Sequence, residues 1–140
     1  MNIEKITQNI SQIVTWYAKT KPNETQLVEL LDNMDRLTGY LWLYADYVAD
    51  AKREYNLKYF TRKVSVSKEK MNLINSGLAV NKAEVEAMLA NETQFQLEQE
   101  AEAICYKADL LLRQGNRVVE AMRSRLSYYK QEKQQSAETN

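Results

Sequence analysis

Residues 27–55 read LVELLDNMDRLTGYLWLYADYVADAKREY, and the spacing of their apolar side chains predicts the fold. Apolar residues recur every seventh position, and a second set follows three residues after each of the first four. This heptad pattern is typical of a helix that packs along its length against another helix at a shallow angle. The first set is Leu27, Met34, Leu41, Val48 and Tyr55, and the second is Leu30, Leu37, Tyr44 and Ala51.

The amino-terminal side of this helix shows a clear break. Apolar residues at spacings of three and four predict a first amphipathic helix over residues 2–18, and Pro22 ends it because proline disfavours helix in the residue before it. Asn23 and Gln26 form a capping-box pattern, which predicts the start of the second helix. That helix is expected to end just before Gly77, which suits a left-handed helix end.

The rest of the chain predicts one more long helix. Asn81 and Glu84 form a second capping-box pattern, and the helix is expected to reach about residue 133, with a break near residues 90–91. Large apolar residues recur at every seventh position, and mostly small residues alternate with them. The large set is Leu97, Ile104, Leu111 and Val118, and the alternating set is Ala101, Ala108, Gly115 and Met122.

These patterns predict an all-α protein, a long antiparallel coiled-coil-like hairpin with an amino-terminal helix beside it. We expect one helical domain over residues 1–133 and a disordered polar tail over residues 134–140. Such a hairpin leaves apolar surface uncovered, so we expect homo-oligomerisation to complete the fold, in preference to a closed monomeric bundle. The predicted oligomerisation surface consists of Leu97, Ile104, Leu111, Val118 and Met122.

Composition argues against most catalytic and metal sites. The 140 residues include three glycines, one proline, one cysteine and no histidine. Without histidine, Ser-His-Asp and Cys-His catalysis and the common zinc sites are excluded, and no glycine-rich loop is present to hold a phosphate. The single cysteine, Cys105, lies among apolar residues and is expected in the core. The sequence therefore predicts a protein that is not an enzyme, with no cofactor and no metal.

Charge is segregated along the chain, although 19 basic and 19 acidic residues balance overall. Residues 24–50 hold six acids and one base, and residues 84–102 hold six acids and no base. Residues 52–70 and 113–133 are predominantly basic. In an antiparallel hairpin each basic segment lies opposite an acidic one, so these charges would set the register of packing.

The basic segment has a second interpretation, as a site for single-stranded nucleic acid. Its basic side chains interleave with aromatic ones. Basic groups neutralise phosphates, and aromatic rings stack on unpaired bases without demanding a sequence. A homo-oligomer would repeat such a weak site many times. The candidate contacts are Lys52, Arg53, Lys58, Tyr59, Arg62 and Lys63.

The run GNRVVEAMRSR, residues 115–125, resembles the last helix of UvsY-like phage recombination mediators. Residues 52–63 stand where that family has a central basic, tyrosine-containing helix. The resemblance implies a small homo-oligomeric protein that binds single-stranded DNA and helps load a recombinase onto strands coated by single-strand-binding protein. It implies Lys58, Arg62 and Lys63 as DNA contacts and the helix of residues 97–126 as the assembly surface.

Two functions follow from these observations. The first is a homo-oligomeric single-stranded DNA-binding accessory protein, and the second is a structural or adaptor coiled-coil protein that binds no nucleic acid. They differ in whether the basic side chains are exposed or paired with the acidic segment. No segment has a signal-peptide pattern or the roughly 20 apolar residues of a membrane helix. We therefore expect a cytoplasmic protein (the bacterial host cytoplasm for a phage protein) with no membrane partner.

Overall fold

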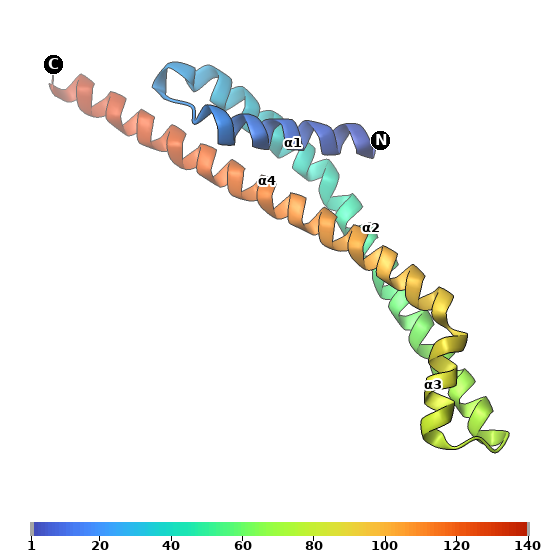
Figure 1. The fold of residues 1–140 in the computed structure, drawn as a ribbon. Coiled ribbons are helices and arrows are strands. Elements are labelled where there is room, and N and C mark those ends of the chain that lie inside the picture. The colour runs from blue at the N-terminus through green and yellow to red at the C-terminus, as the bar shows by residue number, and fades with distance from the viewer. Residues whose placement is uncertain (1, 140) are drawn as a thin grey trace. The chain divides into compact units, whose positions relative to one another are not determined.

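The computed structural model describes residues 2–139, and these residues form four α-helices and no strand. The all-α prediction is therefore confirmed. A short 3-10 helix, η1, precedes the second α-helix. The elements are α1 (Ile3–Thr20), η1 (Glu24–Gln26), α2 (Leu27–Asn75), α3 (Val80–Ala90) and α4 (Glu92–Thr139), shown in Figure 1.

Local hydrogen bonds explain where η1 begins and where α2 ends. The predicted capping box is present. The Asn23 side chain accepts a hydrogen bond from the backbone N–H of Gln26, and the Gln26 side chain accepts one from the backbone N–H of Asn23. At the end of α2, Gly77 has a φ of 101°, a left-handed conformation that glycine adopts without a steric penalty. Its N–H donates to Ile74 and the N–H of Leu78 donates to Leu73, which satisfies carbonyls at the end of the helix.

The start of α3 differs from the prediction, and the break after it agrees. The N-cap is Ala79, which makes no side-chain cap bond, so the predicted Asn81–Glu84 capping box is wrong. Ala83 and Ala87 are fully enclosed, so packing rather than capping chemistry positions this helix. The predicted break is confirmed, since α3 ends at Ala90 and buried Asn91 follows it. The Asn91 side-chain amide donates to the Ala87 carbonyl at 2.7 Å.

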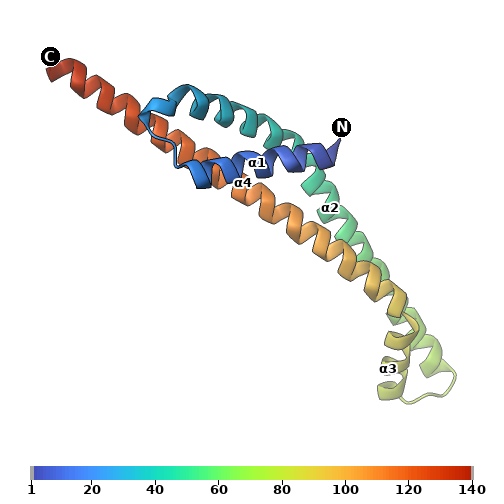
Figure 2. The ribbon, with the colours of Figure 1, turned by 45° about the horizontal axis from the view of Figure 1, so that its top comes forward.

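The carboxy-terminal helix is longer than predicted. α4 continues to Thr139, whereas the sequence predicts disorder over residues 134–140; Asn140 lies outside the described residues. Residues 134–139 contain no glycine or proline, so helix propensity permits the extension. The side chains of residues 130–138 are nearly all exposed, and the last turns of α4 extend past α1 and the start of α2 (Figure 2). The extension is therefore a solvated helix end.

The helices form two compact units. Unit 1 comprises residues 1–48 and 109–140, that is α1, the first part of α2 and the last part of α4. Unit 2 comprises residues 49–108, that is the rest of α2, all of α3 and the first part of α4. In the part of the chain that the structure describes, no helix has both the length and the apolar composition needed to cross a bilayer.

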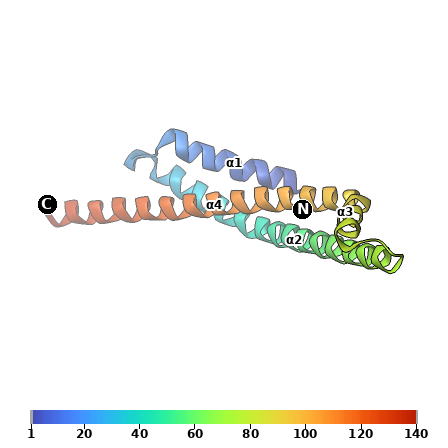
Figure 3. The same ribbon diagram turned by 60° about the horizontal axis from the view of Figure 1, so that its bottom comes forward.

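Unit 1 has a conventional core of large apolar side chains. α1 lies along α2 in Figures 1 and 3, and its inward face contributes three isoleucines to the core. Arg125 of α4 donates to the Pro22 carbonyl, and its guanidinium lies 5.4 Å from the centroid of the Tyr17 ring. The link between α1 and α2 is therefore held by α4. The core residues are Ile6, Ile10, Ile13, Leu30, Leu37, Leu41, Tyr44, Val48, Val119 and Met122.

Two glycines inside helices of unit 1 provide a matched test of this packing. Gly39 has open space where a Cβ would lie, so Gly39→Ala is expected to stabilise the fold by about 0.5–1 kcal/mol through helix propensity. A Cβ on Gly115 would overlap the side chain of buried Leu41. Overpacking costs about 1–3 kcal/mol, so Gly115→Ala should lower the melting temperature while Gly39→Ala raises it. Equal shifts in thermal unfolding would contradict this close approach.

Unit 2 has the opposite distribution of side-chain sizes. Its buried apolar residues are all alanines, and two polar residues, Asn91 and Glu98, are buried with them. Ser65 on α2 donates a hydrogen bond to the Asn91 side-chain carbonyl, which joins α2 to the junction between α3 and α4. Figure 3 shows α3 beside the last turns of α2. The buried alanines are Ala51, Ala83, Ala87, Ala101 and Ala108.

Candidate nucleic-acid interface

All six candidate DNA contacts lie on the part of α2 that belongs to unit 2, and Arg62 has the strongest contacts among them. Its Nε donates to Glu98 Oε2 at 2.7 Å, and its Nη2 donates to Oε1 at 2.9 Å. The Arg62 and Glu98 side chains are only 18% and 10% exposed. A two-donor ion pair of this kind fixes the guanidinium in one orientation. Arg62 therefore joins α2 to α4.

The surroundings of Arg62 reinforce this structural role. The hydrogen bonds with Glu98 raise the pKa of Arg62 and lower the pKa of Glu98 against the opposing effect of burial. The guanidinium lies 5.0 Å from the centroid of the Tyr59 ring and 4.7 Å from that of Phe95. Cations are attracted to aromatic faces at such distances. The basic segment of α2 thus pairs with the acidic segment of α4 at this point, as the charge pattern predicts.

Two other candidates form ion pairs within α2. Lys58 Nζ lies 3.4 Å from Glu54, and the Arg53 guanidinium lies 3.0 Å from Asp50. Both pairs are partly or largely exposed, and helical pairs of this spacing contribute about 0.3–0.5 kcal/mol. Such weak pairs can be exchanged for a phosphate contact at little cost. Lys58 and Arg53 therefore lie at the surface, but each has a neighbouring carboxylate.

The remaining candidates share one side of α2. Lys52, Tyr59 and Lys63 are spaced by seven and four residues, which places them on one face of a helix. The Lys63 ammonium lies 5.3 Å from the centroid of the Tyr59 ring, and Tyr59 is 37% exposed. Among the described residues, no carboxylate lies within ion-pair distance of Lys63. We call these three residues the lysine flank.

Tyr55, which precedes the lysine flank by one turn, has a different environment. It is half-buried, and burial raises the pKa of its hydroxyl, with further contributions from Glu102 and Glu98 of α4. This tyrosine therefore lies half-buried beside the acidic residues of α4, in agreement with its place in the first heptad set.

The predicted oligomerisation residues are distributed over both units. Leu97 and Ile104 are 42% and 51% exposed, and Leu111 and Val118 are half-buried. Met122 is fully enclosed in the core of unit 1, so it cannot form part of an exposed assembly surface. The physical reason is the register of α4, which turns its small residues and Met122 inward.

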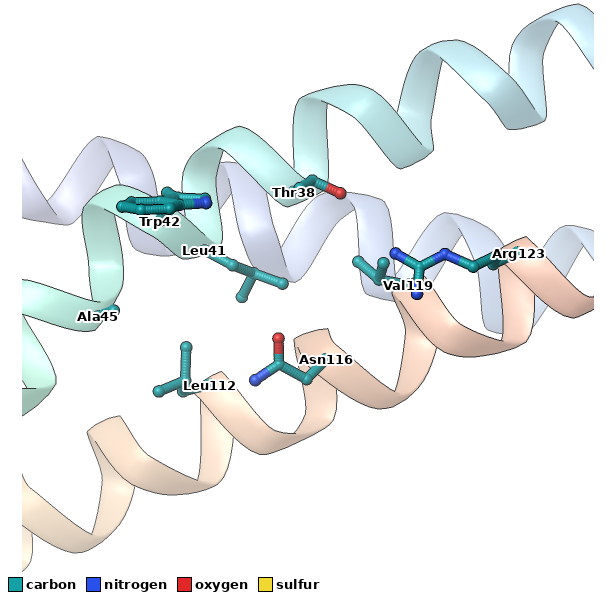
Figure 4. Close-up of a pocket in the computed structure, with 8 residues that line it drawn as sticks. All are labelled: Thr38, Leu41, Trp42, Ala45, Leu112, Asn116, Val119 and Arg123. Atoms are coloured by element: carbon teal, nitrogen blue, oxygen red, sulfur yellow. The ribbon is translucent and has the colours of Figure 1, made fainter.

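Unit 1 contains a pocket of about 440 Å³ between α2 and α4. Figure 4 shows Leu41 and Leu112 approaching from opposite helices, with the Asn116 amide beside them. Trp42 is 78% exposed and lines the same pocket. Its lining contains an amide and one guanidinium, Arg123, but no nucleophile paired with a base. Among residues 2–139, no group of three or more acidic or cysteine side chains could hold a metal ion.

No protein-family model, curated protein or solved structure matches the chain. Among the candidate residues, the lysine flank combines cations with an exposed aromatic ring. The sequence alone did not identify Glu98 as the partner of Arg62. The charge pattern predicts an acidic segment opposite Arg62, but it does not indicate which of the six acids in that segment pairs with Arg62.

Proposed function

We propose that the protein is a homo-oligomeric accessory protein, without catalytic activity, that binds single-stranded DNA in the manner of a recombination mediator. The observation that carries this proposal is the lysine flank, where the Lys63 ammonium lies beside the exposed ring of Tyr59. An ammonium can neutralise a phosphate while an adjacent ring stacks on an unpaired base. By the family resemblance, its partners would be a recombinase and a single-strand-binding protein.

Self-association is part of the proposal because one flank binds weakly. The chain has no net charge, and the lysine flank contains two cations per protomer. Repeating the flank around an assembly raises the effective concentration of each further contact. We infer that α2 and α4 form an antiparallel coiled-coil-like hairpin which other copies complete. The contacts of Arg62 with Glu98 and of Ser65 with Asn91 support an antiparallel arrangement. The later residue of α2 contacts the earlier residue on the other side, as antiparallel helices require.

The second candidate function is an assembly or adaptor protein that binds no nucleic acid. The ion pair between Arg62 and Glu98 favours it, because a nearly enclosed arginine of the segment is occupied by a carboxylate. The pair between Lys58 and Glu54 acts in the same direction. In this case the basic segment serves packing alone.

A titration of labelled oligothymidylate, followed by fluorescence anisotropy, separates the two functions. We expect binding at about 50 mM salt that weakens steeply by about 200 mM, because counterions are released from the phosphates. The Lys52→Ala/Lys63→Ala variant should bind at least roughly tenfold more weakly and with a shallower salt dependence. Tyr59→Leu keeps the apolar contact but removes the aromatic ring, and should also lose roughly tenfold.

The matched control is Lys82→Ala/Lys107→Ala, which removes the same charge from two other exposed positions of unit 2. It should retain nearly all of the wild-type affinity. Equal losses for the two double variants would show that only net charge matters and would contradict a site at the lysine flank. A folded wild-type protein that does not bind at low salt would exclude DNA binding and leave the assembly function.

A further inference from the structure

Unit 2 encloses small side chains and exposes large ones. Its buried apolar residues are five alanines, whereas eleven large apolar side chains between residues 57 and 106 are at least 36% exposed. Exposed apolar side chains that gather into a patch often mark an interface. The exposed apolar side chains include two surfaces that differ in the charge of their neighbouring residues.

The first surface is a stripe on α2. Leu57, Phe60, Val64 and Met71 follow a heptad spacing, which places them on one face of the helix. Leu57, Phe60 and Met71 are 57%, 65% and 56% exposed. Lys68 lies beside this face, in a segment that holds seven bases and two acids between residues 52 and 70. We call the four apolar residues the outer stripe.

The second surface is a groove of about 380 Å³ formed by α3 and the first turns of α4. Its lining includes Val85, Met88 and Leu89, which are 58%, 47% and 68% exposed. Glu92 also lines it, and the segment 84–102 contains six acids and no base. Glu98 is the member of this segment that is used by Arg62. We call this surface the acidic groove.

We propose that the outer stripe of one copy docks into the acidic groove of a second copy. The proposal rests on the self-association in the proposed function and names its surfaces. Both surfaces are apolar at the centre; Lys68 lies beside the stripe, and Glu92 lines the groove. A contact of stripe with stripe would bring lysines together, and a contact of groove with groove would bring carboxylates together, so like charges disfavour both. The surfaces therefore pair with each other.

This pairing is head-to-tail, because the two contacting surfaces differ. Each copy uses its stripe on one neighbour and its groove on another, so the contact generates a ring if it closes and a filament if it does not. By helical spacing, Lys52, Tyr59 and Lys63 lie to one side of the outer stripe. The lysine flank then borders each interface and is repeated at every one.

Complementary variants test the proposal by sedimentation velocity on the full chain. The stripe variant is Leu57→Glu/Met71→Glu, which places acids against the acidic groove. The groove variant is Val85→Lys/Leu89→Lys, which places bases against the basic stripe. We expect the wild type to assemble beyond a dimer and each variant to sediment as a monomer. An equimolar mixture should associate again, because the intact stripe of one variant meets the intact groove of the other.

Circular dichroism of each variant should show wild-type helicity, since all four positions are exposed. A milder pair provides a second readout: Lys68→Glu should weaken assembly, and adding Glu92→Lys in the same chain should restore it. Wild-type assembly by either double variant, or a mixture of folded variants that stays monomeric, would overturn the interface. A monomeric wild type would overturn the self-association itself, whereas an assembled wild type with assembled variants would overturn only the named surfaces.

Discussion

Replacing Arg62 with alanine is expected to lower the free energy of unfolding by about 3 kcal/mol, because it leaves a buried carboxylate without its counter-charge. Glu98 is buried, and its carboxylate accepts two hydrogen bonds from Arg62. Arg62→Lys keeps the charge but not the two-donor geometry, so its cost should be intermediate. Urea unfolding followed by circular dichroism measures these differences.

The control for this prediction is Arg53→Ala. Arg53 pairs with Asp50 on the surface, where both side chains are more than two-thirds exposed, so its removal should cost no more than about 0.5 kcal/mol. The double variant Arg62→Met/Glu98→Leu should recover most of the lost stability, since replacing both charges removes the unpaired one. A loss at Arg62 no larger than that at Arg53 would show that the ion pair is not buried in solution.

The same pair predicts how stability depends on pH. The hydrogen bond from Arg62 lowers the pKa of Glu98 below its ordinary value of 4.5, so the unfolded chain binds a proton there more readily than the folded one. This contribution is present above pH 4.5 and is lost as the pH falls through the lower, folded pKa. The urea midpoint should therefore fall on acidification, and it should fall less in Glu98→Gln than in the wild type.

Leu37→Ala is expected to destabilise unit 1 by about 2–5 kcal/mol, which lowers the melting temperature by roughly 10 °C. Leu37 is fully enclosed, and alanine would leave a cavity among the core residues of unit 1. Leu43 lies on the same helix and is 49% exposed, so Leu43→Ala provides the matched control and should cost much less. Thermal unfolding compares the two variants. A smaller shift for Leu37 than for Leu43 would reverse the inward face assigned to α2.

The inward face of α2 could be predicted from sequence because its two heptad sets have the same character. Leu30, Leu37, Leu41, Tyr44 and Val48 all belong to the two predicted heptad sets, and all are buried. Within this segment either set is apolar enough to pack, and helix geometry places them side by side. The pattern therefore determines both the helix and its buried side.

The buried side of α4 could not be predicted in the same way. Its two alternating sets differ in size, and periodicity favours the large set, which includes Leu97 and Ile104. The structure encloses the small set instead, with Ala101 and Ala108 buried and Leu97 and Ile104 exposed. Small residues permit a close approach of the facing helix, which no count of apolar residues in one helix can indicate.

The candidate site illustrates a similar limit. Sequence identifies the basic and aromatic residues of α2, and it predicts an acidic segment opposite them. It does not distinguish Arg62, which is enclosed by Glu98, Tyr59 and Phe95, from Lys63 one residue later. One step along a helix is a rotation of 100°, so neighbouring basic residues have different roles once the register is known.

Because its interior consists of alanines, the stability of unit 2 should depend on the concentration of the protein. An alanine removes far less apolar surface from water than a leucine does, so unit 2 alone gains little hydrophobic stabilisation. With the interface proposed above, its larger side chains lose contact with water only when another copy is present. Dilution then lowers the stability of unit 2 by mass action, although the isolated chain keeps its helices. Unit 1, which encloses isoleucine and leucine side chains of its own, would lose little stability on dilution.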